Sequence, residues 1–170
     1  MIKGPEFIRA VDAFMPMEKA IGGLEALSWR PARQGEAHKV CVKLPLEVDG
    51  EFREEHRLLL SADPDQDRLV FSVGILFMDW CVCRLDFDEF DSHGNHWHPT
   101  LPSRVKGPHW HSWELNRPLF KKLGNFKRLE YAEPFTAARR FDATLRWYCA
   151  ERRIHIGGNE IPFPPRGGLL

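Results

Sequence analysis

The sequence lacks the long apolar run that a membrane span requires. It has no stretch of about 18 consecutive apolar residues. The segment MIKGPEFIRAVDAF carries acidic residues and a proline where a signal peptide needs an apolar stretch. These absences predict a chain with no membrane partner that stays in the cytoplasm, the compartment where it is made.

Cysteine is also scarce. Four cysteines are irregularly spaced over 170 residues, which predicts reduced thiols rather than a disulfide framework. Cys81 and Cys83 lack the two-residue spacer of redox and zinc motifs, so we interpret them as buried strand residues. The sequence has no P-loop, dinucleotide fingerprint or nucleophile elbow, so it carries none of the motifs that mark those enzyme classes.

The chain has no net charge, because 24 basic and 24 acidic residues balance. Residues 1–100 hold 11 Lys and Arg against 18 Asp and Glu, whereas residues 101–170 hold 13 against 6. A basic C-terminal part could meet phosphates, but the two halves could equally neutralise each other across the folded surface. Overall charge therefore does not predict a nucleic-acid-binding protein.

Length and apolar content predict one domain. A chain of 170 residues with 43% apolar residues can bury one sizeable core. We expect a single α+β domain over residues 1–156. The segment 157–170 is punctuated by proline and glycine and is expected to be an extended or disordered tail.

Alternating apolar residues predict strands. Residues 40–48 alternate, an Asp-Gly turn follows, and residues 52–61 return as the second strand of a hairpin. Pro45 indicates that the first of these strands lies at an edge or is bulged there. Residues 69–77 are apolar on both faces, which is typical of a central strand. Two further strands are expected at residues 80–88 and 108–114.

Helical spacing predicts two short helices near the N-terminus, over residues 5–14 and 17–27. A longer helical stripe runs over residues 134–153 and includes Phe135, Phe141 and Leu145. The predicted fold class is therefore α+β: an antiparallel sheet of about five strands, with the N-terminal helices and one long C-terminal helix packed on it.

Five of the eight histidines fall within nineteen residues, between Arg84 and Glu114. They comprise two His-x-His pairs and one further histidine, and charged residues accompany them: His96 and His98, His109 and His111, His93, Arg84, Asp86, Asp91 and Glu114. Residues two apart on a strand project the same way, so each pair can direct both imidazoles into one cleft.

The site depends on how the last two predicted strands pair. If they pair antiparallel, His109 and His111 lie over the face that bears Arg84 and Asp86. The alternative is that the tryptophans at 97, 110 and 113 form a surface cluster that the histidines cap. That alternative suits any one histidine, but five in so short a segment favour a functional site.

A nuclease is the first chemistry that fits. One neutral histidine would accept the 2′-hydroxyl proton of RNA, and a protonated one would donate to the leaving oxygen. We assign His109 and His111 to these roles, Arg84 to stabilising the developing charge and Asp86 to orienting a histidine. This mechanism needs no cofactor.

A metal site is the second chemistry that fits. Three or four imidazoles could hold zinc or another divalent ion, with Glu114 or Asp86 as a ligand or an outer partner. In this alternative the candidate ligands are His96, His98, His109 and His111. A third hypothesis is a non-enzymatic protein that binds and inhibits another macromolecule.

The order Arg84-x-Asp86, a histidine-rich loop and Pro108-His109-x-His111 resembles the core of bacterial toxin proteins of the TumE type. The similarity covers residues 82–112. The resemblance implies a growth-inhibiting toxin that a partner antitoxin neutralises. It gives functional weight to Arg84, Asp86, His98, His109 and His111. Our leading hypothesis is therefore a toxin-like, histidine-dependent RNA-cleaving enzyme of a bacterial or mobile-element system.

A basic stretch after the histidines is a candidate surface for RNA. Phe120 and Phe126 are interleaved with its cations, so it could hold a phosphate backbone and stack bases, although such stretches are more often solvated loops. The candidate substrate-binding residues are Lys121, Lys122, Lys127 and Arg128 of this stretch, together with Trp97 and Trp110.

Overall fold

The structure, a computed structural model, describes residues 4–22, 28–32, 39–66, 68–123, 129–157 and 163–165. In chain order its elements are α1 (Pro5–Phe14), β1 (Lys19–Ile21), β2 (Arg30–Pro31), β3 (Val40–Val48), β4 (Glu51–Ala62), β5 (Phe71–Phe77), β6 (Trp80–Phe87), β7 (Ser92–Gly94), β8 (Arg104–Lys106), β9 (His109–His111), α2 (Trp113–Leu123), β10 (Glu133–Pro134), α3 (Phe141–Glu151) and β11 (Ile154–His155).

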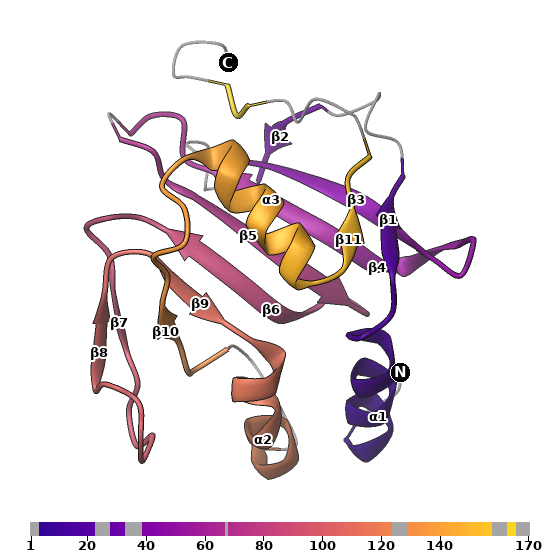
Figure 1. Ribbon diagram of the computed structural model, residues 1–170, viewed down its shortest axis with the longest axis horizontal. Coiled ribbons are helices and arrows are strands. Elements are labelled where there is room, and N and C mark those ends of the chain that lie inside the picture. The colour runs from indigo at the N-terminus through magenta and orange to yellow at the C-terminus, as the bar shows by residue number, and fades with distance from the viewer. Residues whose placement is uncertain are drawn as a thin grey trace.

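A nine-stranded mixed sheet has the order β10-β9-β6-β5-β4-β3-β1-β11, with β2 paired to β3. The strands from β3 to β6 are joined antiparallel in sequence order, whereas β1 and β11 pair parallel. A separate ribbon of β7 and β8 projects beside β10, and α3 lies across the sheet (Figure 1).

The predicted fold class was wrong in the size of the sheet and in the long helix. The sheet has nine strands instead of about five and is mixed rather than antiparallel. Four of the additional strands, β1, β2, β10 and β11, are two or three residues long. Alternation cannot reveal strands that short, because only their pairing partners define them.

The helices are fewer and shorter than predicted. The stripe over 134–153 yields only α3, of 11 residues, because Phe135 is buried from an extended segment before the helix begins. Of the predicted helix over 17–27, the described part forms β1 and residues 23–27 lie outside the described residues. None of the described helices is long and apolar enough to cross a bilayer.

The β3–β4 hairpin follows the sequence prediction. Asp49 and Gly50 both have positive φ, 54° and 79°, as a tight two-residue hairpin turn requires. The predicted irregularity at Pro45 is confirmed, because the register between β3 and β4 shifts between Pro45 and Leu46. The central position of β5, between β4 and β6, is confirmed as well.

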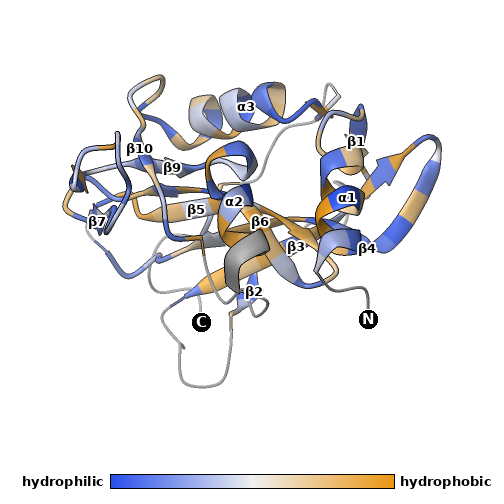
Figure 2. Ribbon diagram, turned by 90° about the horizontal axis from the view of Figure 1, so that it is seen from below, coloured by the Kyte–Doolittle hydropathy of each residue, from blue (hydrophilic) through white to orange (hydrophobic). Residues whose placement is uncertain are grey.

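The helices α3 and α1 cover the same face of the sheet. Phe141 of α3 packs edge-on against Phe71, and Phe7 of α1 packs against Phe77. Phe71 and Phe77 are six residues apart on β5, an even spacing that puts both on one face. Figure 2 shows α3 on one side of the sheet. The main apolar core lies between this face and the helices.

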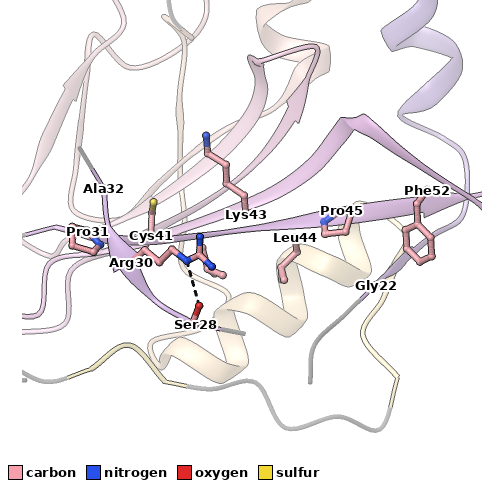
Figure 3. Close-up of a pocket in the computed structure, with 11 residues that line it drawn as sticks. Gly22, Ser28, Arg30, Pro31, Ala32, Cys41, Lys43, Leu44, Pro45 and Phe52 are labelled. Atoms are coloured by element: carbon pink, nitrogen blue, oxygen red, sulfur yellow. Dashed lines mark hydrogen bonds between the residues drawn. The ribbon is translucent and has the colours of Figure 1, made fainter. Parts of the chain in front are cut away.

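The opposite face, which we call the open face, carries two rows of side chains across five strands. The registers align Cys41, Ser61, Ser72, Asp86 and His109 in one row. They align Lys43, Leu59, Gly74, Arg84 and His111 in the next. At the β3 end, Cys41 and Lys43 line a cavity of about 620 Å³, where they point away from Leu44 (Figure 3).

A buried lysine ties the two ends of the fold together. Nζ of Lys19 donates to the carbonyls of Met15, Met17 and Arg152 at 2.7–3.0 Å. The side chain is almost fully buried. Burial, reinforced by the charge of Arg152, lowers the pKa of Lys19 to about 8.

Replacing Phe141 with alanine tests the packing of α3. Phe141 is 2% exposed and contacts the ring of Phe71, so Phe141→Ala leaves a cavity in the core. We expect the free energy of unfolding, measured by urea denaturation, to fall by about 3–5 kcal/mol. The matched control is Phe52→Ala, because Phe52 is 56% exposed and should change stability much less. Equal losses in both variants would contradict the assigned core.

Candidate functional site

Strands β6 and β9 bring the predicted arginine, carboxylate and histidines together. They pair antiparallel, with Arg84 opposite His111 and Asp86 opposite His109. This confirms the pairing that was assumed from the sequence. Residues two apart on a strand point to the same face, so all four side chains lie on the open face.

The Asp86 carboxylate lies at the centre of this group. Its Oδ2 atom accepts a hydrogen bond from Nε of Arg84 at 2.8 Å. The same oxygen lies 3.5 Å from Nε2 of His109 and 3.4 Å from Nε2 of His111. Burial by itself raises the pKa of Asp86, but the two imidazoles and the Arg84 charge outweigh it and hold that pKa well below its usual range. Asp86 is therefore ionised at neutral pH.

Backbone carbonyls fix the outer nitrogens of the two strand histidines. Nδ1 of His109 lies 2.9 Å from the Gly107 carbonyl oxygen, and Nδ1 of His111 lies 2.9 Å from that of Tyr131. A carbonyl oxygen only accepts, so each Nδ1 carries a proton and donates it. In a neutral ring the lone pair is then on Nε2, which faces Asp86. Nε2 of His111 is buried without a hydrogen-bond partner among the described residues.

A third histidine joins the pair from the β7–β8 ribbon. Nε2 of His93 donates to the Glu130 carbonyl at 2.7 Å. Its ring stacks on His109 at 5.2 Å between centroids and meets His111 edge-on at 4.6 Å. One nitrogen from each of the three rings lies within 4.8 Å of the others. We call these three residues together with Asp86 the histidine cluster.

Two buried asparagines hold the segment that supplies these carbonyls. The Asn116 side chain accepts the backbone N–H groups of Glu130 and Tyr131, both at 2.9 Å. The Asn95 side chain accepts the N–H of Ala132 and donates to its carbonyl, both at 2.8 Å. This support fixes the orientation of two of the histidines, as outer hydrogen bonds do for metal-ligating imidazoles.

The pKa values of His109 and His111 move in opposite directions. Burial lowers the pKa of both. At His109 the Asp86 carboxylate and the Gly107 carbonyl outweigh burial, and the pKa is raised above its ordinary value. At His111 burial outweighs Asp86, and the pKa is lowered. The metal-free cluster therefore favours an imidazolium at His109 and a neutral ring at His111.

Solvent reaches the histidine cluster over its charged side. The side chains of His109 and His111 are 3% and 0% exposed, whereas those of Arg84 and Asp86 are 38% and 21% exposed. A cleft of about 390 Å³ reaches the cluster at Asp86, and its lining also includes Ser61, Ser72 and Asp91. Solvent therefore contacts the cluster at Arg84 and Asp86.

The other histidines predicted as ligands do not join the cluster. His96 is exposed. His98, predicted also as catalytic, is half-buried: its Nδ1 accepts the N–H of Leu101 at 3.1 Å and its ring packs on Tyr131. The structure brings His93 to the cluster instead.

The two tryptophans predicted to bind substrate lie in unlike surroundings. Trp97 is 96% exposed and has a φ of 67°. Trp110 is buried and packs against Trp147 and Tyr148 of α3, on the face opposite the histidines. Trp110 is therefore inaccessible to a base, whereas Trp97 is free to stack on one.

The basic stretch is only partly described. Arg117 forms hydrogen bonds with Asp12, which join α2 to α1. Lys121 and Lys122 belong to α2, but their side chains lie outside the description, as do residues Lys127 and Arg128 altogether. Their role in RNA binding stays a prediction.

Sequence reasoning did not assign His93, Asn95 or Asn116 to the site. His93 was noticed only as one of five histidines, because its place depends on how the β7–β8 ribbon docks. Asn95 lies in the same histidine-rich loop, which was the available signal. Asn116 gives no signal, because an asparagine within a helix is ordinary until its partners are known.

Comparison of the chain with protein-family models, with characterised proteins and with solved structures found no match. The fold and the site define the class of molecule in physical terms: a mixed-sheet protein whose open face carries a histidine and carboxylate cluster.

Replacing Asp86 with asparagine tests the electrostatics of the cluster. Loss of the carboxylate removes a major cause of the raised pKa of His109, so we expect that pKa to fall, as measured by NMR titration of the imidazole. A raised folded-state pKa stabilises the fold below the unfolded value of about 6.5, and this contribution disappears as the pH rises through the folded value. Asp86→Asn should therefore lose relatively more stability at pH 5.5 than at pH 7.5.

His56 is an internal control for this titration. It is buried between Phe14 and Phe77, and burial lowers its pKa with no contribution from Asp86. The pKa of His56 should stay the same in Asp86→Asn. An unchanged pKa at His109 would show that the carboxylate does not control this imidazole.

Proposed function

We propose that this protein binds a divalent metal ion, with zinc-like ligand preference, through His93, His109 and His111, next to the Asp86 carboxylate. One observation carries the proposal. Each imidazole donates one N–H to a backbone carbonyl, and one nitrogen from each ring lies within 4.8 Å of the others. Metal-ligating histidines are held in this way, since the outer bond sets which nitrogen keeps its lone pair.

The ligand set favours a borderline divalent ion. Three imidazoles suit zinc and related ions better than calcium or magnesium, which prefer oxygen. Zinc bonds of about 2.0–2.1 Å separate tetrahedral ligand atoms by about 3.3 Å, so binding would draw the nitrogens together from their present spread. The charged, partly exposed side of the cluster leaves room for water or a ligand at the metal. That is the arrangement of a catalytic rather than a closed structural site.

Metal binding should displace a proton. The raised pKa of His109 favours a proton on its Nε2 beside Asp86 in the metal-free protein. A metal needs that nitrogen deprotonated, so affinity should fall as the pH drops. Titration calorimetry in two buffers of different ionisation enthalpy should report release of protons on metal binding, and more of them at lower pH.

A metal-independent ribonuclease is the second candidate, with a toxin–antitoxin role implied by the resemblance of residues 82–112. The opposite pKa shifts of His109 and His111 favour it, because an acid and a base are needed together. Their burial opposes it, because a general acid or base must come within hydrogen-bond reach of RNA. We therefore place the metal site first.

We expect one zinc ion per chain after loading and dialysis, measured by elemental analysis. His111→Ala removes a ligand and should weaken binding by more than the roughly 10–100-fold that loss of an outer partner causes. His93→Ala should do the same. Because His93 is only half-buried, this second variant is expected to keep its fold, which circular dichroism would check.

Two histidines outside the cluster provide matched controls. His96 is exposed, and His155 bonds to Glu18 on the surface. His96→Ala and His155→Ala each remove one imidazole but should keep the bound zinc. Equal metal loss in these variants, or a wild-type protein that binds no zinc, would contradict the proposed site.

The two candidate functions differ in their response to a chelator. A metal-dependent activity on RNA should disappear with a chelator and return when zinc is added back. Cleavage that survives chelation, and that falls about 10²–10⁴-fold in His109→Ala or His111→Ala, would favour the ribonuclease.

A further inference from the structure

The guanidinium of Arg84 has more donors than partners. Nε donates a hydrogen bond to Asp86. Among the residues that the structure describes, this is the one hydrogen bond that the guanidinium makes. The four N–H groups on its terminal nitrogens are left to solvent, on a side chain that is 38% exposed. A planar guanidinium that offers two nitrogens side by side is suited to an oxyanion.

A glycine makes room for this arginine on the open face. A Cβ at Gly74 would lie 3.1 Å from the Cys83 carbonyl oxygen, 3.3 Å from Sγ of Cys81 and 3.5 Å from Cγ of Arg84. The bare backbone of β5 thus allows the stem of Arg84 to lie close to the sheet. This keeps the guanidinium beside the histidine cluster, because Nε is already held by Asp86.

A pair of serines supplies a further donor next to Asp86. Ser72 lies opposite Asp86 on β6, and its hydroxyl is 2.6 Å from that of Ser61. Two hydroxyls that share one hydrogen bond use one proton between them, so the second proton is free to donate to a ligand. Both serines line the cleft that borders the cluster.

The charges around this cleft favour an anion once the metal is present. Without metal, Arg84 and Asp86 form an ion pair. A divalent ion adds two positive charges next to Arg84, and neighbouring cations repel unless an anion lies between them. The cleft lining carries Asp63, Asp86, Asp88 and Asp91 against Lys39 and Arg68. With a divalent ion bound, the positive charges, Arg84 included, exceed these four carboxylates by one.

We propose that the open face beside the metal binds a phosphoryl group, which contacts the metal through one oxygen and accepts hydrogen bonds from Arg84 and the Ser61–Ser72 pair through the others. A carboxylate has only two oxygens, so it satisfies fewer of these donors. The inference rests on the proposed metal site and names the class of ligand for it.

Calorimetry with inorganic phosphate on the zinc-loaded protein tests the inference. Arg84→Met should weaken phosphate binding by about 10- to 100-fold, because it removes charge-assisted hydrogen bonds. Arg84→Lys keeps the charge but loses the planar fork, so its phosphate affinity should lie between that of the wild type and that of Arg84→Met. The matched control is Arg9→Met, because Arg9 is exposed on α1, and phosphate should bind to it as to the wild type.

Separate measurements distinguish failure of the ligand site from failure of the metal site. Zinc content is determined for every variant, and Arg84→Met should retain one ion. Phosphate binding that is equal in zinc-loaded Arg84→Met and wild type would overturn the inference and leave the metal site intact. If the wild type binds no zinc, the metal proposal fails. Phosphate affinities of the metal-free wild type and Arg84→Met then decide the anion site alone, with a difference supporting it and equality overturning it.

A dinucleotide and acetate test which chemical class of ligand binds at this site. A dinucleotide that binds through Arg84 identifies a phosphodiester site, whereas binding of inorganic phosphate alone identifies a site for a terminal or free phosphate. Acetate that binds as tightly as phosphate would overturn the choice of a phosphoryl group, because a carboxylate would then suffice.

Discussion

The register between β6 and β9 is the constraint on which the site depends. It sets Asp86 against His109 and Arg84 against His111. A shift of one residue would turn both histidines to the helix-covered face and Trp110 to the open face. Trp110 opposes such a shift. Its ring is buried against α3, and the guanidinium of Arg152 lies over it at 4.9 Å. The aromatic residue between the histidines thus aligns them.

The same register explains how a carboxylate can stay charged in a largely buried position. The Asp86 carboxylate contacts Arg84 on its own strand and the imidazoles of His109 and His111 on the neighbouring strand. An unpaired buried carboxylate would take up a proton, whereas these partners favour the ionised form. A proton on His109 and a metal ion would compensate the same negative charge. In the proposed metal site, proton and metal would therefore compete for one position, and the metal occupancy would depend on pH.

The parts of this protein that were predictable from sequence are those with a strong local pattern. The hairpin over residues 40–61, the central strand near residues 71–77 and the buried Phe141 all follow from alternation or helical spacing. The proximity of Arg84, Asp86, His109 and His111 followed from one assumed pairing. Strands of two or three residues lacked enough alternation to be recognised, and these gave the sheet its full width.

The local sequence pattern does not reveal which histidine joins His109 and His111 in the cluster. His96 and His98 form a pair as regular as His109 and His111, and nothing in their spacing separates members of the histidine cluster from loop residues. His98 uses its Nδ1 to accept a backbone N–H within its own loop, whereas His93 is carried to the cluster by the β7–β8 ribbon. That difference arises from tertiary docking, which depends on residues 130–132 far along the chain.

The Lys19 anchor has a consequence for the order in which the chain can fold during translation. One of its three carbonyl partners, Arg152, is 133 residues away, and the parallel neighbour of β1 is made just after it. At about 5–20 residues per second, a ribosome needs roughly 7–27 s to cover that distance. Throughout that interval β1 lacks β11 as a neighbour, and the ammonium lacks one of its three carbonyl partners. The nascent chain therefore exposes an unpaired strand edge, the kind of surface on which another chain can add, until β11 emerges.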